Sequence, residues 1–376
     1  MPRKKKQKIA LCMIVKNEAH VIQRALYSVS GVVDHYYICD TGSSDGTQDI
    51  IKDWLKTNKK KGRVVDKPWV DFAHNRNDAF ALAKNKCDYI MTLDADEVLL
   101  PLKDNKPDHE GLLESFPEFI AEQVDAMCHF GNAQYLRPLL FKGDVDWVWT
   151  SPMHESCSKQ EGTPTKELIE GVCNYPRAEG SRSKDSRKSF KDALVLEKHL
   201  LDNPNHCRSL FYLGQCYYDD KKFERAMEAM ESALKLSVWE EEQYVLYLRM
   251  ARCCQNLPSK EDEAVSYYLK AYDVFPKRPE AMYELLEYYR KKSLFSVANI
   301  YGELALELSR QKEGILFLES SVYDWRILDS LALSYFYGGR VKDCLKLCST
   351  LQTKAPESEK KRIAKNLDGF RKGLKV

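Results

Sequence analysis

The chain has 376 residues, of which 44% are hydrophobic and 30% are charged, and its formal net charge is +2. Since this length exceeds what a single hydrophobic core usually holds, we expect two domains in a globular protein of ordinary composition. The near-neutral charge excludes a field strong enough to make nucleic acid the main partner, and the basic run within residues 1–8 indicates a solvated tail rather than a targeting or nucleic-acid arm.

The N-terminal half begins with alternating strand and helix patterns. Residues 9–15 form a continuous apolar run that predicts a buried strand, and Asn17 can then cap a helix that ends near Gly31. A second strand over residues 35–39 leads into a turn-rich loop over residues 40–47. This order is typical of a strand–helix–strand unit.

The same plan continues along the chain. A helix is predicted over residues 50–55, a third strand over residues 63–65 and a further helix over residues 77–84. The fourth strand begins at Tyr89 and ends at Asp94. Such alternation predicts an α/β fold with a mostly parallel sheet and helices on both faces.

Acidic side chains follow two of the predicted strands. Asp94 and Asp96 come directly after the fourth strand, and Asp40 follows the second. Because the carboxyl ends of parallel strands meet at one edge of a sheet, these carboxylates could reach a divalent cation or the ribose of a nucleotide. The alternative is that they only mark where the chain meets solvent. Likewise, Gly42 and Gly46 either let backbone amides approach a ligand or simply form a tight turn.

Four motifs in this region resemble those of family 2 glycosyltransferases with the GT-A fold. They are Cys12–Glu18 (CMIVKNE), Ile38–Thr47 (ICDTGSSDGT), Phe72–Asn77 (FAHNRN) and Leu93–Val98 (LDADEV). Four motifs in the right order are far more specific than any one of them. The resemblance implies a Rossmann-like GT-A catalytic domain over residues 9–186. It also implies a metal-dependent reaction, with Mn²⁺ or Mg²⁺, that takes a sugar from a uridine diphosphate (UDP) sugar with inversion.

The resemblance further implies a role for each matched residue. Asp40 would contact the uracil or the ribose, and Arg76 a base carbonyl or a phosphate. Asp94 would lie by the ribose and the metal, and Asp96 would hold the metal. Asp96 would act in catalysis, because a cation at the diphosphate stabilises the charge that develops as the sugar leaves. The other nucleotide-sugar contacts that the resemblance implies are Val15, Asn17, Glu18, Gly42, Ser43, Asp45 and Ala95.

Beyond Glu97 the resemblance is weaker. A strand-like run over residues 134–141 precedes a segment that contains His154 and Glu155 and is similar to the Trp…His-Glu stretch of family members with added helical repeats. His154 is a candidate third metal ligand or else a packed or exposed histidine. Glu155 is the candidate base that deprotonates the acceptor, and its rivals are Asp146 and Asp185.

A polar, basic loop over residues 180–185 precedes the helical half of the chain. Arg182 and Lys184 in this loop could close over the diphosphate once the donor binds, as mobile loops do in related transferases. A solvated interdomain linker accounts for the same composition equally well.

The remaining residues, 187–376, lack strand patterns and repeat small residues at fixed offsets. Ala226, Ala264, Ala298 and Cys344 occupy equivalent positions in tetratricopeptide-like helix pairs of ~34 residues, with an insertion near residues 311–324. Stacked pairs bury a shared core, and their faces commonly hold a peptide, another subunit or a second copy in a homodimer. The combination resembles the plan of bacteriocin S-glycosyltransferases, which favours a peptide or protein acceptor and leaves a glycan acceptor open.

Two other functions compete with a glycosyltransferase. One is a non-catalytic scaffold in which the repeats bind a protein partner, and the intact motif residues argue against it. The other is a nucleotidyltransferase that makes a nucleotide-sugar, but Lys16-Asn17-Glu18 stands where such enzymes usually carry a glycine-rich phosphate loop.

The sequence also predicts a compartment. No stretch approaches the ~18–20 apolar residues of a membrane span, and residues 9–15 are too short for a signal peptide. The 12 cysteines are scattered, without the Cys-x-x-Cys spacing of zinc sites, which favours buried thiols over disulfides. We therefore expect a cytoplasmic protein without a membrane span.

Overall fold

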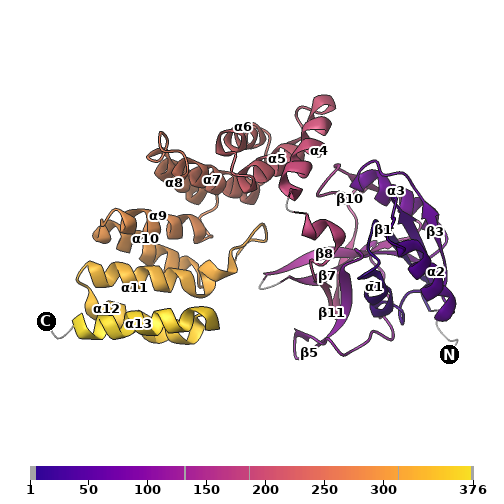
Figure 1. Ribbon diagram of the computed structural model, residues 1–376, viewed down its shortest axis with the longest axis horizontal. Coiled ribbons are helices and arrows are strands. Elements are labelled where there is room, and N and C mark those ends of the chain that lie inside the picture. Colours follow the sequence, from indigo (N-terminus) through magenta and orange to yellow (C-terminus); the bar gives the residue numbers. More distant parts are fainter. Residues whose placement is uncertain (1–5, 131–132, 186, 312, 374–376) are drawn as a thin grey trace. The chain divides into compact units, whose positions relative to one another are not determined.

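A computed structural model describes residues 6–130, 133–185, 187–311 and 313–373. The chain divides into two compact units, residues 1–202 and 203–376 (Figure 1). The first unit is α/β and the second consists of helices, so the predicted fold class is confirmed. Helix α4 (Lys188–Asp202) belongs to the first unit, although the predicted boundary after residue 186 lies before it. Of the predicted basic tail, residues 1–5 lie outside the described residues.

The first unit is built on a sheet whose N-terminal part is parallel. Four strands pair in the order β3-β2-β1-β4, all parallel, which agrees with the predicted parallel sheet. They are β1 (Ile9–Val15), β2 (His35–Asp40), β3 (Lys61–Asp66) and β4 (Tyr89–Thr92). All four strands therefore release the chain at the same edge.

The rest of the sheet is mixed. Strand β8 pairs antiparallel with β4, and the order continues β8-β7-β11-β5-β6. These strands are β5 (Glu97–Lys103), β6 (Lys106–Pro107), β7 (Gln123–Phe130), β8 (Ala133–Lys142) and β11 (Lys166–Pro176). A separate two-stranded sheet contains β9 (Trp147–Thr150) and β10 (Ser156–Lys159). This mixed part of the sheet places segments that are distant in sequence beside the residues that follow β4.

Helices cover both faces of the parallel part, and the alternation within β1 explains how. Leu11 and Met13 pack in one apolar cluster with α1 (Ile22–Ser28) and α2 (Thr47–Thr57). Ala10 and Cys12 lie in a second cluster with α3 (Phe72–Ala83). Successive strand residues point to opposite faces, so a strand buried on both sides reads as a continuous apolar run.

Two predicted helix starts are wrong. Asn17 does not cap α1, because it adopts a φ of +58° and its Oδ1 atom accepts the Ser44 N–H at 2.8 Å. Helix α3 begins at Phe72, before the predicted Asn77, because the Asp71 side chain caps it by accepting the His74 N–H at 2.7 Å. The Asn17 bond joins residues 27 positions apart, which no local pattern reveals, whereas the Asp71 cap is a local signal three residues from its donor.

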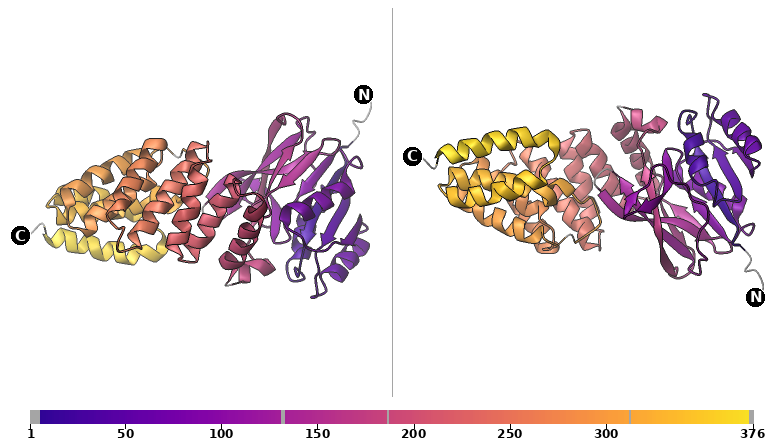
Figure 2. Two further views of the ribbon diagram at one scale, coloured as in Figure 1. Left: turned by 90° about the horizontal axis from the view of Figure 1, so that it is seen from above. Right: turned by 90° about the horizontal axis from the view of Figure 1, so that it is seen from below.

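The second unit consists of antiparallel helix pairs stacked side by side (Figure 2). Ala226, Ala264, Ala298 and Cys344 are each 0% exposed, which confirms them as the small positions where paired helices meet. The helices are α5 (Cys207–Asp219), α6 (Phe223–Leu234), α7 (Glu240–Gln255), α8 (Glu263–Val274), α9 (Glu280–Lys291), α10 (Phe295–Leu308), α11 (Ile327–Tyr337), α12 (Val341–Lys354) and α13 (Glu357–Gly373).

An irregular segment interrupts this array after α10. It ends in a π-helical turn (Val322–Arg326) that leads directly into α11, so the predicted insertion is confirmed. Every cysteine is a free thiol, including the adjacent Cys344 and Cys348, whose sulfur atoms are 4.0 Å apart.

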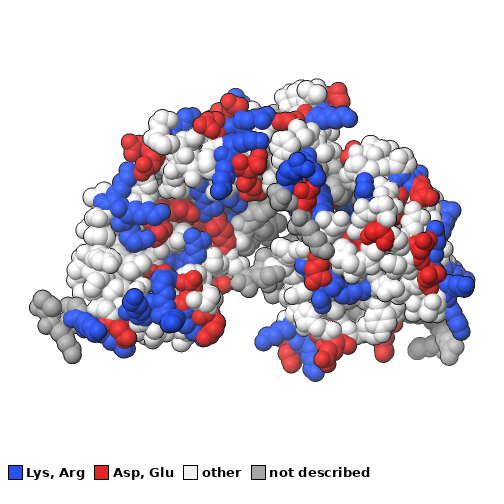
Figure 3. Space-filling model, in the orientation of Figure 1, with Lys and Arg blue, Asp and Glu red and all other residues white. Residues whose placement is uncertain are grey.

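Surface charges of both signs are interspersed on the face shown in Figure 3. Among the described residues, no helix is both long and apolar enough to cross a membrane.

Candidate active site

A cavity of about 580 Å³ in the first unit lies where β1 and β4 end. Its wall is formed by the residues after β1, the residues after β4, helix α3, residues 180–182 and the first half of α4. Its size falls within the range of ordinary small-molecule sites. The cavity is therefore at the sheet edge where the sequence placed its candidate ligand-binding residues.

Asp94 is held between two arginines. The Arg76 Nη2 atom lies 2.7 Å from Asp94 Oδ1, and the Arg137 Nη2 atom lies 3.1 Å from Asp94 Oδ2. Arg76 is nearly buried and also pairs through Nε with Glu155 Oε1 at 2.5 Å, while Arg137 pairs with Glu97. Burial alone would raise the pKa of Asp94, but the two guanidinium groups hold it well below its usual range.

The pKa of Asp94 leads to a prediction about stability against acid. Because the pKa of Asp94 is lower in the folded state than in the unfolded chain, ionised Asp94 stabilises the fold at pH values above about 3.9, the pKa in the unfolded chain. This contribution is lost as the pH falls toward the pKa of the folded state. Asp94→Asn should therefore destabilise the first unit at pH 7 and reduce its loss of stability below about pH 4. Because the Asp94 side chain is 35% exposed, solvent screens the pairs and we expect a cost of about 1–2 kcal/mol at pH 7.

Thermal unfolding from pH 7 to pH 2.5 measures this effect. Asp49→Asn is the matched control, because Asp49 lies on α2 outside the cavity and its side chain is 85% exposed. If Asp94→Asn and the unmodified chain lost stability in parallel below pH 4, Asp94 would not be the group responsible.

Asp96 and Glu18 both accept backbone N–H groups from the same segment. The Gly180 N–H donates to Asp96 Oδ2 at 3.0 Å, and the Ser181 N–H donates to Glu18 Oε1 at 3.2 Å. A Cβ atom at Gly180 would lie 2.8 Å from Asp96 Oδ2, so only glycine allows this approach without a shift. Burial raises the pKa of Glu18, and the nearby charge of Asp96 raises it further.

The loop after β2 is ordered around Asp40. Its Oδ1 atom accepts the N–H groups of Gly42 and Ser43 at 2.9 and 2.8 Å, and its buried Oδ2 atom has no hydrogen-bond partner among the described residues. Asp45 accepts the Ala19 N–H at 3.0 Å, and the Ser43 hydroxyl accepts the Asn17 N–H at 2.8 Å. The loop therefore positions the residues after β1 that line the cavity.

The predicted nucleotide-sugar contacts fall into two groups. Those that line the cavity are Val15, Asn17, Glu18, Arg76, Asp94, Ala95 and Arg182, together with the predicted catalytic Asp96. Those in the adjoining loop are Asp40, Gly42, Ser43 and Asp45. The side chain of Lys184 lies outside the described residues.

Two of the three predicted metal ligands, Asp94 and Asp96, line the cavity, but the third and the predicted base do not. His154 is exposed and is not part of the cavity wall, and Glu155 is engaged by Arg76. The rivals for the base are also paired, Asp146 with Lys84 and Asp185 with Lys191. Among the described residues, no group of three or more His, Cys, Asp or Glu side chains is placed to hold a metal ion.

Sequence reasoning missed an aromatic part of the wall. The Arg182 guanidinium lies 4.7 Å from the centre of the Phe72 ring, and the Trp69 ring meets Phe72 edge-on at 4.8 Å. Arg182 also pairs with Asp192 of α4. Phe72 lies one helical turn before Arg76 on α3, so their spacing of four residues was a signal that both face the same site.

Two family matches correspond to the two kinds of structure. Residues 10–105 match the family described as "Glycosyl transferase family 2", and residues 186–271 match the family described as "Anaphase-promoting complex, cyclosome, subunit 3". The first match contains the four motifs on which the resemblance depends. A family 2 glycosyltransferase domain followed by tetratricopeptide-like repeats is thereby confirmed.

Individual relatives match parts of the chain. An "Uncharacterized glycosyltransferase" of Rickettsia felis is 29% identical over 135 residues, which are 36% of this chain and 44% of that protein. A "TPR repeat-containing protein" of Synechococcus elongatus is 39% identical over 93 residues, 24% of this chain and 21% of that protein. The chain thus spans less than half the length of these curated relatives. A solved structure described as "Crystal structure of MamA protein" is 17% identical, with a TM-score of 0.36, and the match covers 47% of this chain and 90% of that one.

Proposed function

We propose that this chain is a glycosyltransferase that transfers a sugar from a UDP-sugar to a nucleophilic group of a peptide, protein or glycan, with inversion and with the help of a divalent cation. The observation that carries this proposal is the cavity at the ends of β1 and β4, where Asp94 and Asp96 meet Arg76 and Glu18. The family 2 match over residues 10–105 supports it, because the match includes all of these residues.

Asp96 is the side chain that best fits a divalent cation. It lines the cavity, and one of its carboxylate oxygens accepts a single backbone N–H, whereas both oxygens of Asp94 accept guanidinium groups. Mg²⁺ and Mn²⁺ are commonly held by one or two carboxylates together with phosphate oxygens and waters. When bound, such a cation supplies positive charge where the leaving diphosphate becomes more negative.

Basic side chains of the wall would hold the diphosphate. Lys16 and Lys188 line the cavity, and neither has an ion-pair partner within the part of the chain that the structure describes. Arg76 is already oriented by Asp94 and Glu155, so it would lose little freedom on binding a donor. The choice of Glu155 as the base stays a prediction, and the Arg76–Glu155 pair would have to open before Glu155 could accept a proton from the acceptor.

Release of nucleoside diphosphate from a panel of nucleotide-sugars tests the proposal. We expect slow hydrolysis of one UDP-sugar with Mn²⁺ and without acceptor, and its loss with chelator. If no donor is hydrolysed and none raises the melting temperature, the repeat scaffold becomes the better account. Formation of a nucleotide-sugar from a sugar phosphate and a nucleoside triphosphate would instead identify a nucleotidyltransferase.

A further inference from the structure

The insertion between α10 and α11 contains a segment, residues 313–319, that contacts α5, α7 and the start of α9. Each of these is the first helix of an antiparallel pair, α5 with α6, α7 with α8 and α9 with α10. The Phe317 ring stacks on Phe211 of α5, with 6.0 Å between ring centres. The backbone of residues 315 and 316 is bound by α7, and residue 319 by the start of α9. We call the surface formed by α5, α7 and α9 the first-helix face.

Glu241 of α7 binds the N–H groups of this segment. Its Oε1 and Oε2 atoms accept the Ile315 N–H at 2.9 and 3.0 Å, and Oε2 accepts the Leu316 N–H at 2.9 Å. Glu241 is only 5% exposed, and no cation pairs with it within the described residues. Two backbone N–H groups are therefore the groups that compensate the burial of this carboxylate.

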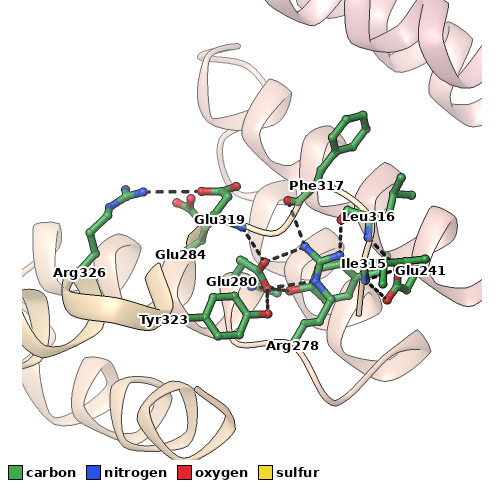
Figure 4. Close-up of polar contacts among 12 residues, drawn as sticks. Glu241, Arg278, Glu280, Glu284, Ile315, Leu316, Phe317, Glu319, Tyr323 and Arg326 are labelled. Carbon is green, nitrogen blue, oxygen red and sulfur yellow. Dashed lines mark hydrogen bonds and ion pairs between the residues drawn. The ribbon is translucent and has the colours of Figure 1, made fainter. Parts of the chain in front are cut away.

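Arg278, immediately before α9, binds the carbonyl groups of the same segment. Its Nη1 atom donates to the Leu316 oxygen at 2.6 Å and its Nη2 atom to the Phe317 oxygen at 3.4 Å, as Figure 4 shows. The guanidinium also pairs with Glu280 at 2.7 Å, and both side chains are 0% exposed. Glu280 in turn accepts the Glu319 N–H at 3.4 Å. Three buried charges thus recognise donors and acceptors along one stretch of backbone.

The two glutamates at the ends of the segment form ion pairs, Glu313 with Lys277 and Glu319 with Arg252, but two of its apolar side chains are bound much less than its backbone. Ile315 is 69% exposed and Phe317 is 44% exposed, although both are large and apolar. Gly314 has a φ of +96°, and a Cβ atom there would lie 2.4 Å from Glu241 Oε1, so the close approach of the chain requires glycine. Recognition between the two glutamates therefore depends on main-chain polar groups and on a glycine at the entry, and ion pairs hold the two ends of the segment.

We propose that the first-helix face is a binding site for an extended peptide backbone, and that residues 313–319 are its resident ligand. In the free protein this ligand closes the face to other peptides. Glu241 accepts two consecutive N–H groups, Arg278 donates to the carbonyl groups of residues 316 and 317, and Glu280 accepts one more N–H. The ligand class is an extended peptide that carries glycine before the first bound amide. The proposal is independent of sugar transfer, because all of its residues lie in the second unit.

Binding of a synthetic peptide in trans tests the proposal. In the 376-residue chain, Ile315→Pro, Leu316→Pro and Glu319→Pro together remove the N–H groups that Glu241 and Glu280 accept, and a fluorescent peptide with the sequence Glu-Gly-Ile-Leu-Phe-Leu-Glu is titrated against this variant and the unmodified chain. We expect binding at least ten-fold tighter to the variant, because its site is vacant. Equal affinity for both proteins, or no binding to a variant with unchanged helix content, would overturn the proposal.

A modified peptide distinguishes backbone recognition from hydrophobic adhesion. N-methylation at the positions of Ile315 and Leu316 removes the two N–H groups that Glu241 accepts and leaves the side chains intact. We expect this peptide to bind at least ten-fold more weakly than its parent. Equal binding would show that the site does not read the backbone.

Hydrogen exchange on the unmodified chain tests the same site without altering the segment. The amides of Ile315 and Leu316 should exchange much more slowly than that of Val238, a loop residue whose exposed fraction is 96%. Glu241→Ala should remove this protection, whereas Glu240→Ala, one residue earlier and exposed, should not. Exchange as fast as at Val238 in the unmodified chain would mean that the segment is not a bound ligand.

Discussion

Asp96→Asn is expected to lower the rate of sugar transfer by at least about 100-fold, the loss typical when charge stabilisation is removed from a transition state. The replacement removes a negative charge and retains the shape of the side chain. Its amide oxygen can still accept the Gly180 N–H, so the contact between residues 96 and 180 persists and the fold should be unchanged. The loss would therefore report on the chemistry of the site.

Two measurements make this test specific. The first is the transfer or hydrolysis rate with the donor found in the panel, and the second is the rise in melting temperature caused by UDP with Mn²⁺. Both should be lost in Asp96→Asn and kept in Asp49→Asn, whose side chain lies outside the cavity. Full activity of Asp96→Asn with added Mn²⁺ would show that Asp96 is not a metal ligand.

Arg278→Met is expected to destabilise the second unit by about 3–5 kcal/mol, because removing one partner leaves a buried charge uncompensated. The Arg278–Glu280 pair is 0% exposed, so water cannot replace the lost guanidinium without a local opening. The carbonyl groups of Leu316 and Phe317 would lose their donor at the same time. The effect is large because several buried acceptors depend on one cation.

Chemical denaturation, monitored by hydrogen exchange at amides of the second unit, measures this loss of stability. Arg340→Met is the matched control, because Arg340 is also doubly paired, with Glu303 and Asp343, but its side chain is 44% exposed and its loss should cost less than about 1 kcal/mol. The double variant Arg278→Met, Glu280→Leu should be more stable than Arg278→Met alone, since it leaves no unpaired carboxylate. Similar losses for Arg278→Met and Arg340→Met would contradict this account of Arg278.

Local patterns were sufficient for the four parallel strands and for part of the cavity wall. The apolar run of β1 and the strand that ends before Asp94 are confirmed, because hydrophobic periodicity acts over a few neighbouring residues. The four motifs lie within residues 12–98, and the wall residues of this part follow directly from strand ends that parallel topology brings together. The repeat positions could likewise be predicted from the sequence, since each helix pair buries a small residue at the equivalent position.

Long-range pairings had to come from the tertiary structure. Arg76 and Glu155 are 79 residues apart, and Asp96 meets Gly180 across 84 residues, so no local pattern links them. The prediction of Asn17 as a helix cap failed for the same reason, because its side chain binds Ser44 instead.

The amino-acid sequence by its own periodicity and motifs was therefore enough to predict two kinds of domain and the edge of the sheet where a nucleotide-sugar would bind. Only the folded chain decided which acids are neutralised by arginines and which segment fills the first-helix face. The physical reason is that strands and helices follow from short-range burial and backbone hydrogen bonding, whereas a buried charge takes whichever partner the whole fold brings within reach. Glu241 illustrates this, since its partners at residues 315 and 316 lie 74 and 75 residues further along the chain.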